Sequence, residues 1–150
     1  MFEFDGQVCL VTGAGNPNGI GFGCAKQLGL SGGTVIITAT TERIYERVEE
    51  LKAMGVRKVY GCIANLCDRK AVKTLITEIT EQHGTIDVLV NNAGNASIAD
   101  REKGDIHANL CDMDDKTWDA IIERNLTLTY NVTAEVLKVM RKNRYGRIVF

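Results

Sequence analysis

The glycines of one short segment near the N-terminus have the clearest chemical meaning in this chain. The segment reads TGAGNPNGIG at positions 12–21 and lies between an apolar run and an amphipathic stretch. Glycine lets a backbone turn sharply and approach a ligand closely, and the start of a helix presents unpaired N–H groups and a positive dipole end. Such a turn can also exist for steric reasons alone. Its position between a strand and a helix favours a cradle for the pyrophosphate of a dinucleotide.

The elements that must position this turn follow from the apolar periodicity. Strands are predicted at Gln7–Val11, Thr34–Thr38, Lys58–Ile63, Ile86–Val90 and Arg147–Phe150, and helices at Gly19–Leu30, Glu42–Met54, Asp68–Gln82 and Asp115–Lys142. The polar, aperiodic stretch Asn95–Asp114 is predicted to be a long loop, and such loops are often functional. The alternation predicts an α/β, Rossmann-like, doubly wound parallel sheet with helices on both faces. We expect residues 1–150 to form one dinucleotide-binding domain that is truncated in its fifth strand.

Composition excludes several classes of partner. The 18 basic and 19 acidic residues give a formal charge of −1, which offers no electrostatic reason to expect nucleic acid or an anionic membrane surface. No apolar run is long enough to span a bilayer, and the N-terminal residues lack the pattern of a signal peptide. The five cysteines include no C-x-x-C pair and no second cluster that would complete a zinc site. We therefore expect no metal site, reduced and mostly buried cysteines, and a cytoplasmic location.

Four motifs, in this order along the chain, resemble those of the short-chain dehydrogenase/reductase family. They are the TG and GIG of residues 12–21, NNAG at 91–94, the asparagine of RNL at 124–126, and GRIV at 146–149. The resemblance covers essentially the whole chain. It is closest to the 3-oxoacyl-acyl-carrier-protein reductase group, mainly through ITATT at 37–41.

The resemblance implies that several loops bind a nicotinamide cofactor. Their residues are Thr12, Gly13, Gly15, Asn18, Gly19, Ile20 and Gly21, then Thr40 and Thr41, Asn65 and Leu66, and Asn91, Ala93 and Gly94. Asn65 would donate to and accept from the base, and Asn91 would also stabilise the sheet. The resemblance gives Asn125 a catalytic role, holding a water that relays protons. Alternatively, Asn125 only interrupts its helix. The proton relay would need the same interruption, so the two interpretations overlap.

Two features depart from the family pattern. Five residues separate the first glycine of the turn from the Gly-x-Gly pair, where the commonest form has three, and they include Pro17, which stiffens the loop. Some members carry longer forms, so we expect the phosphate site to be kept. The loop after Gly94 is also longer than is typical, and it would lie beside the substrate and affect specificity.

The residues after the second predicted strand bear on the choice of cofactor. A carboxylate there would bind the ribose hydroxyls of NAD and repel a 2′-phosphate, but the chain has Ala39 and no acid before Glu42. Thr40 and Thr41 offer hydroxyls and Arg43 a cation, unless these residues merely begin the next helix. NADP(H) is therefore favoured, with NAD(H) as the alternative.

The resemblance also implies a catalytic serine and a Tyr-x-x-x-Lys pair, which this chain lacks. No tyrosine is followed four residues later by lysine, and the two serines, Ser31 and Ser97, do not follow the fifth strand. We expect the N-terminal portion of an oxidoreductase that interconverts a carbonyl and an alcohol, plausibly a 3-oxoacyl thioester, with the 150 residues alone inactive. The full-length protein would be a homo-oligomer. The alternatives are a non-catalytic nicotinamide-nucleotide-binding module and an interaction protein that has lost its cofactor.

Overall fold

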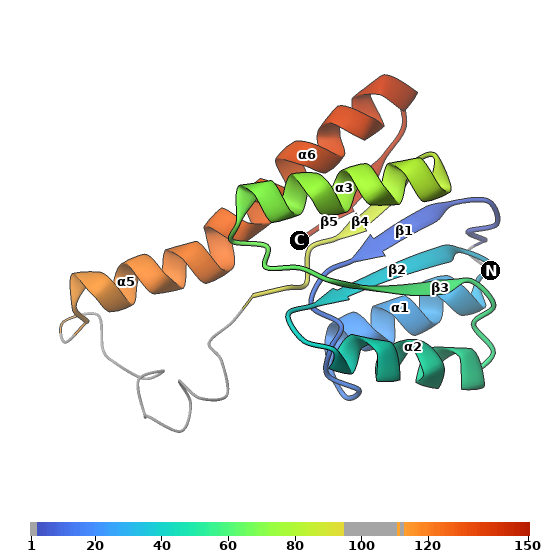
Figure 1. Ribbon diagram of the computed structural model, residues 1–150, viewed down its shortest axis with the longest axis horizontal. Helices are drawn as coiled ribbons and strands as arrows, with labels where there is room; N and C mark the ends of the chain where they lie inside the picture. The colour runs from blue at the N-terminus through green and yellow to red at the C-terminus, as the bar shows by residue number, and fades with distance from the viewer. Residues whose placement is uncertain (1–2, 95–110, 112) are drawn as a thin grey trace.

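The computed structural model describes residues 3–94, 111 and 113–150. Five strands form one parallel sheet in the order β3-β2-β1-β4-β5. They are β1 (Val8–Val11), β2 (Thr34–Ala39), β3 (Val59–Ile63), β4 (Val88–Val90) and β5 (Arg147–Val149). The helices are α1 (Ile20–Leu30), α2 (Arg43–Ala53), α3 (Arg69–His83), α5 (Asp115–Ile122) and α6 (Leu128–Asn143), with a π-helical segment, η3 (Glu123–Thr127), between α5 and α6 (Figure 1). The predicted doubly wound parallel sheet is confirmed.

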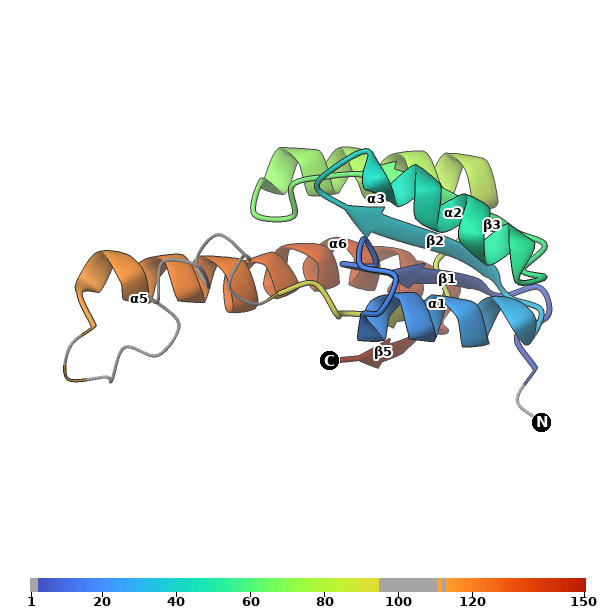
Figure 2. The same cartoon turned by 90° about the horizontal axis from the view of Figure 1, so that it is seen from below.

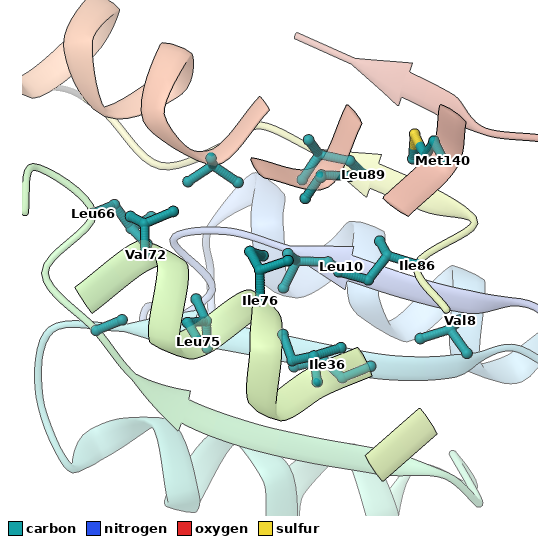
Figure 3. Close-up of a cluster of buried hydrophobic side chains, with 14 of the residues drawn as sticks. Val8, Leu10, Ile36, Leu66, Val72, Leu75, Ile76, Ile86, Leu89 and Met140 are labelled. Atoms are coloured by element: carbon teal, nitrogen blue, oxygen red, sulfur yellow. The ribbon is translucent and has the colours of Figure 1, made fainter. Parts of the chain in front are cut away.

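Alternating side chains of the strands divide the core into two layers. In β1, Val8 and Leu10 pack on one face, whereas Cys9 and Val11 pack on the other. Helices α3 and α6 cover the first face, where Leu10, Ile76 and Leu89 belong to one buried cluster (Figure 3). Helices α1 and α2 cover the second face. Burial on both faces explains why β1 and β2 read as continuous apolar runs.

The strand order places a switch point between β1 and β4. From β1 the chain adds β2 and β3 in one direction, and it then returns to add β4 and β5 on the other side. The two connecting segments leave a crevice at the carboxyl ends of these neighbouring strands, which is where ligands bind in open α/β sheets. The glycine-rich turn follows β1 and the NNAG motif follows β4, so the fold brings the two motifs together.

Helix α5 extends beyond the sheet in both views (Figures 1 and 2). It has no buried residue, and its Trp118 and Ile121 are exposed. The exposed apolar side chains continue along the helices as Leu126, Tyr130 and Leu137. The helix predicted for Asp115–Lys142 is thus divided by η3, and no residue of its N-terminal part, α5, is fully buried.

The ends of two helices leave apolar side chains exposed. Ile20, one of the predicted cofactor-binding residues, is the first residue of α1 and is 79% exposed. Met54 is also exposed, since α2 ends one residue earlier. The expectation of mostly buried cysteines holds fully only for Cys9. Cys24, Cys62 and Cys67 are half-buried and Cys111 is exposed, and all five thiols are free.

No helix among the described residues is both long and apolar enough to cross a membrane. Nor do the described ranges contain a group of His, Cys, Asp or Glu side chains arranged to hold a metal ion. The predicted loop Asn95–Asp114 lies largely outside the described residues, so its role stays a prediction.

Candidate functional site

A cavity of about 1120 Å³ opens at the carboxyl ends of the first four strands. Its walls come from the segments that follow β1, β2, β3 and β4, and from η3 and the start of α6. Most of the predicted site residues line it, namely Gly13, Gly15, Gly19, Ile20, Thr40, Thr41, Asn65, Leu66, Asn91, Ala93, Gly94 and Asn125. Thr12, Asn18 and Gly21 do not line it. The predicted site residues that line it are up to 112 positions apart in the sequence, from Gly13 to Asn125.

The three predicted residues outside the cavity support its walls. Thr12 is fully buried, and its Oγ1 accepts hydrogen bonds of 3.0 Å from the backbone N–H groups of Asn92 and Ala93. Gly21 lies against Asn92, and a Cβ at this position would come 3.0 Å from the Asn92 Cγ. The N–H of Asn18 donates to the side-chain oxygen of Asn16 at 3.0 Å. These contacts fix the turn rather than face a ligand.

Gly13 is the point where the two motifs touch. Its φ of +71° favours glycine, and a Cβ here would lie 2.9 Å from the backbone nitrogen of Ala93. The Nδ2 of Asn92 donates to the carbonyl oxygens of Thr12 and Gly13, both at 2.9 Å. Asn92 itself lines the cavity, although it was not among the predicted cofactor-binding residues.

The longer form of the glycine-rich turn closes on itself. The Asn16 side chain accepts from Asn18, and the Asn16 carbonyl accepts from the N–H of Gly19 at 3.0 Å. Asn16 lines the cavity and was missed by the sequence analysis, although the preference of asparagine for such turns was an available signal. Gly19 precedes α1, and no described side chain caps that helix. Its first N–H groups and positive dipole end therefore lie at the cavity, ready for an anion.

The end of β2 forms a corner of the cavity without a carboxylate. Ala39, Thr40, Thr41 and Arg43 line it, and the Arg43 Nε donates to the Thr41 Oγ1 at 3.4 Å. Among the described lining residues, the single acid is Glu123, which belongs to η3. Arg43 thus lies at the cavity and not away from it. The corner is cationic, which suits a phosphate group.

A buried arginine stands behind this corner. Arg47 of α2 is 7% exposed, and its guanidinium donates to the carbonyl oxygen of Gly15 at 3.4 Å. The same guanidinium is ion-paired with Glu46 at 3.1 Å and Glu50 at 2.7 Å. It ties α2 to the glycine-rich turn. Arg47 was not predicted as a site residue, although its spacing from Ile44 and Leu51 places it on the buried face of α2.

The turn after β3 forms another wall. The Asn65 Oδ1 accepts from the N–H of Cys67 at 3.1 Å, and the Asn65 carbonyl accepts from the N–H of Asp68 at 3.1 Å. One acceptor site of the Asn65 Oδ1 thus serves the turn, and the expectation that this amide donates to and accepts from a base stays a prediction. Cys67 also lines the cavity. Burial and the nearby Glu123 raise the pKa of its thiol, which does not favour a nucleophilic thiolate.

Asn91 links the cavity to α6. Its Nδ2 donates to the Oγ1 of Thr133 at 3.0 Å, while its Oδ1 is buried and accepts no hydrogen bond from the described residues. Asn91 therefore lines the cavity and stabilises the packing of β4 at once.

Asn125 lies within the π-helical interruption. Its Nδ2 donates to the carbonyl oxygen of Ile121 at 2.9 Å, and its own carbonyl accepts from the Thr129 hydroxyl at 2.7 Å. The Oδ1 of Asn125 is close to Gly94, where a Cβ would come within 3.0 Å of it. The local break that was expected at Asn125 is confirmed, and π-helical turns occur frequently at functional sites.

A parallel sheet whose switch point carries a glycine-rich turn and a helix N-terminus defines the dinucleotide-binding class of α/β proteins. The model of the short chain dehydrogenase family matches residues 7–150, so the chain belongs to that family. It is 36% identical over 144 residues to the 3-oxoacyl-[acyl-carrier-protein] reductase FabG of Haemophilus influenzae, covering 96% of this chain and 54% of that protein. The chain thus spans about half the length of the curated relatives it matches.

Solved structures show the same fold. A metagenomic short-chain oxidoreductase in complex with NADP has a TM-score of 0.83 and 32% identity, over 97% of this chain and 61% of its own. An actinorhodin polyketide ketoreductase with NADPH has a TM-score of 0.82 and 32% identity, over 95% of this chain and 51% of its own. A xylitol dehydrogenase with bound NAD⁺ has a TM-score of 0.85 and 26% identity, over 98% of this chain and 53% of its own.

Proposed function

We propose that this chain supplies the cofactor site of a reductase that uses NADP(H) to interconvert a carbonyl and an alcohol. The observation that carries the proposal is the pairing, in one cavity, of the uncapped start of α1 with the carboxylate-free corner at Thr40, Thr41 and Arg43. The two features suit the two phosphate-bearing parts of NADP(H), namely the pyrophosphate and the 2′-phosphate.

The glycine-rich turn would hold the pyrophosphate. Its backbone can approach closely at Gly13, Gly15 and Gly19, and the helix dipole of α1 favours the negative charge. Neighbours that bind NADP, NADPH and NAD⁺ support a nicotinamide dinucleotide as the ligand. When bound, the nicotinamide would supply the hydride chemistry.

The corner at the end of β2 would select between NADP(H) and NAD(H). The hydroxyls of Thr40 and Thr41 can donate to a phosphate, and the guanidinium of Arg43 can bind it with two N–H groups. Among the residues that the structure describes, no acidic side chain lines this corner to bind the paired ribose hydroxyls of NAD(H). NAD(H) is the weaker alternative.

The rest of the cavity would hold the remaining parts of the cofactor. Asn65 and Leu66 would contact the base, Asn91, Ala93 and Gly94 the adenosine ribose, and Asn125 would hold a proton-relaying water. The resemblance to 3-oxoacyl-acyl-carrier-protein reductases supports a 3-oxoacyl thioester as the substrate of the whole protein. The exposed apolar side chains of α5 and α6 favour a homo-oligomer, and the free cysteines favour a cytoplasmic location.

The 150 residues contain neither a Tyr-x-x-x-Lys pair nor a serine after β5, so we propose that they have no reductase activity by themselves. The same observation supports a second candidate, a nicotinamide-nucleotide-binding module without catalysis. The two candidates share the cavity and differ only in what the whole protein does after the cofactor is bound.

Calorimetric titration of the purified chain with NADPH and with NADH tests the shared part. We expect NADPH to bind at least about tenfold more tightly, because the 2′-phosphate gains charge-assisted hydrogen bonds. Tighter binding of NADH would contradict the assignment of the corner, and failure to bind either nucleotide would contradict the proposed function itself.

A further inference from the structure

A buried asparagine of α6 holds the turn that follows β3. The Nδ2 of Asn131 donates to the carbonyl oxygens of Leu66, at 3.1 Å, and of Cys67, at 3.2 Å. Asn131 is 4% exposed. Because both neighbours are acceptors, the nitrogen and not the oxygen of this amide must face the turn. Leu66 and Cys67 both line the cavity, so Asn131 supports its wall from outside.

A second contact joins the same turn to η3. The Sγ of Cys67 donates to the carbonyl oxygen of Glu123 at 3.6 Å. That carbonyl also accepts from the N–H of Leu128, which is the i to i−5 bond of the π-helical segment. The turn therefore contacts the interrupted helix on both sides of Asn125, at Glu123 before it and at Asn131 after it.

Asn131 occupies a position where packing alone would favour an apolar residue. Its neighbours Leu128, Val132 and Val136 are all buried, in the same core cluster as Val72 and Ile76 of α3. The Oδ1 of Asn131 is buried and accepts no hydrogen bond from the described residues. Burying an amide oxygen without a hydrogen-bond donor lowers the stability of the fold. The two hydrogen bonds that the Asn131 nitrogen donates to the turn offset this cost.

We propose that Asn131 is a positioning residue of the nucleotide site. It fixes the Asn65–Cys67 turn as the wall against the base, and through Cys67 this wall is coupled to the π-helical segment that carries Asn125. Binding of the adenosine half of a nucleotide would then steady η3. The inference rests on the proposed nucleotide-binding function.

The first test uses 2′,5′-ADP, which contains only the adenosine half of NADP. Replacement of Asn131 by Leu keeps the size of the side chain but removes both hydrogen bonds. We expect Asn131→Leu to weaken binding of 2′,5′-ADP about tenfold or more, since two buried carbonyls lose their donor. The matched control is Asn143→Leu at the other end of α6, where Nδ2 donates to the Thr85 hydroxyl at 2.8 Å. It should bind like the unchanged chain.

The second test measures amide hydrogen exchange with and without 2′,5′-ADP. In the unchanged chain we expect the ligand to slow exchange at both Cys67 and Leu128, the latter being the donor of the π-helical bond. Cys67→Ala removes the thiol donor from a side chain that packs at the edge of the core. At a 2′,5′-ADP concentration that saturates this variant, it should keep the response at residue 67 and lose the response at Leu128. Cys67→Ser restores a donor and should restore the response.

The outcomes separate the two claims. If the unchanged chain does not bind 2′,5′-ADP, the proposed function fails and this inference fails with it. If the chain binds, and Asn131→Leu retains its affinity while Cys67→Ala retains the response at Leu128, the inference alone is overturned. Should Asn131→Leu not fold, the Cys67 pair of variants decides the coupling.

Discussion

A Cβ placed on Gly13 would lie 2.9 Å from the backbone nitrogen of Ala93, so the glycine-rich turn and the NNAG motif pack backbone against backbone. The contact joins the ends of β1 and β4 at the switch point of the sheet. The hydrogen bonds of Asn92 to the carbonyls of Thr12 and Gly13 close the same junction. Its integrity sets the shape of the cavity floor.

The first prediction concerns this contact. Gly13→Ala should abolish measurable NADPH binding and lower the free energy of unfolding by about 3 kcal/mol or more, because the Ala93 backbone cannot move aside. Gly84→Ala is the matched control, since its φ is +81° but a Cβ there meets nothing within 4 Å. The control should lose only about 1 kcal/mol and bind normally. Equal effects of both changes, in calorimetry and chemical denaturation, would contradict the role of the contact.

The second prediction concerns Thr12, whose hydroxyl is buried between the two motifs. Thr12→Val should lower the free energy of unfolding by about 2 kcal/mol, because the N–H groups of Asn92 and Ala93 lose their acceptor. Thr12→Ser keeps that acceptor and should lose much less. Urea denaturation of the three proteins measures the difference. A valine variant as stable as the serine variant would show that the hydroxyl is not needed.

The third prediction concerns the choice of cofactor. Arg43→Gln should weaken NADPH binding about tenfold and leave NADH binding unchanged, since only NADPH carries the 2′-phosphate. Lys52→Gln on the same helix is the control. The Lys52 ammonium pairs with Glu49 and does not line the cavity, so affinity for both nucleotides should persist. If Arg43→Gln weakens the binding of NADPH and NADH equally, Arg43 does not recognise the 2′-phosphate.

The fourth prediction concerns the exposed apolar stripe of α5, η3 and α6. We expect the chain to self-associate through side chains such as Leu126, which is 62% exposed, and Tyr130, which is 60% exposed. Leu126→Glu should shift the population toward monomer in sedimentation velocity. Ile63→Glu adds the same charge at an exposed site on β3 and should not. A chain that is monomeric at high concentration before any change would contradict this prediction.

Much of the fold could be predicted because local and global signals agree. The continuous apolar runs at Val8–Val11 and Thr34–Ala39 are typical of strands that are buried on both faces, and the helices between them show one apolar side. The strand order, and with it the switch point, came only from the structure. The interruption of the long helix was expected at Asn125, but hydrophobic periodicity does not show that it takes the form of the π-helical segment η3.

Site residues that belong to a sequence motif could be predicted, whereas site residues that act only through tertiary contacts could not. Gly13 and Ala93 belong to motifs, and both line the cavity. Arg47 and Asn131 act from behind the walls, through carbonyls of Gly15, Leu66 and Cys67 that carry no sequence signal. Ile20, which the glycine-rich motif marked as a cofactor-binding residue, also lines the cavity.

The central claim is that this cavity binds a 2′-phosphorylated dinucleotide, and NMR mapping of amide shifts on titration with NADPH tests it most directly. With NADPH, the account predicts shifts at Gly13, Gly15, Gly19, Thr40 and Thr41. With NADH, the shifts at Thr40 and Thr41, which follow β2, should be smaller. Amides on the far side of the sheet, such as that of Gly84, should not respond. Saturating NADPH with no shift at the glycine-rich turn, or with shifts confined to residues outside the cavity, would contradict the claim.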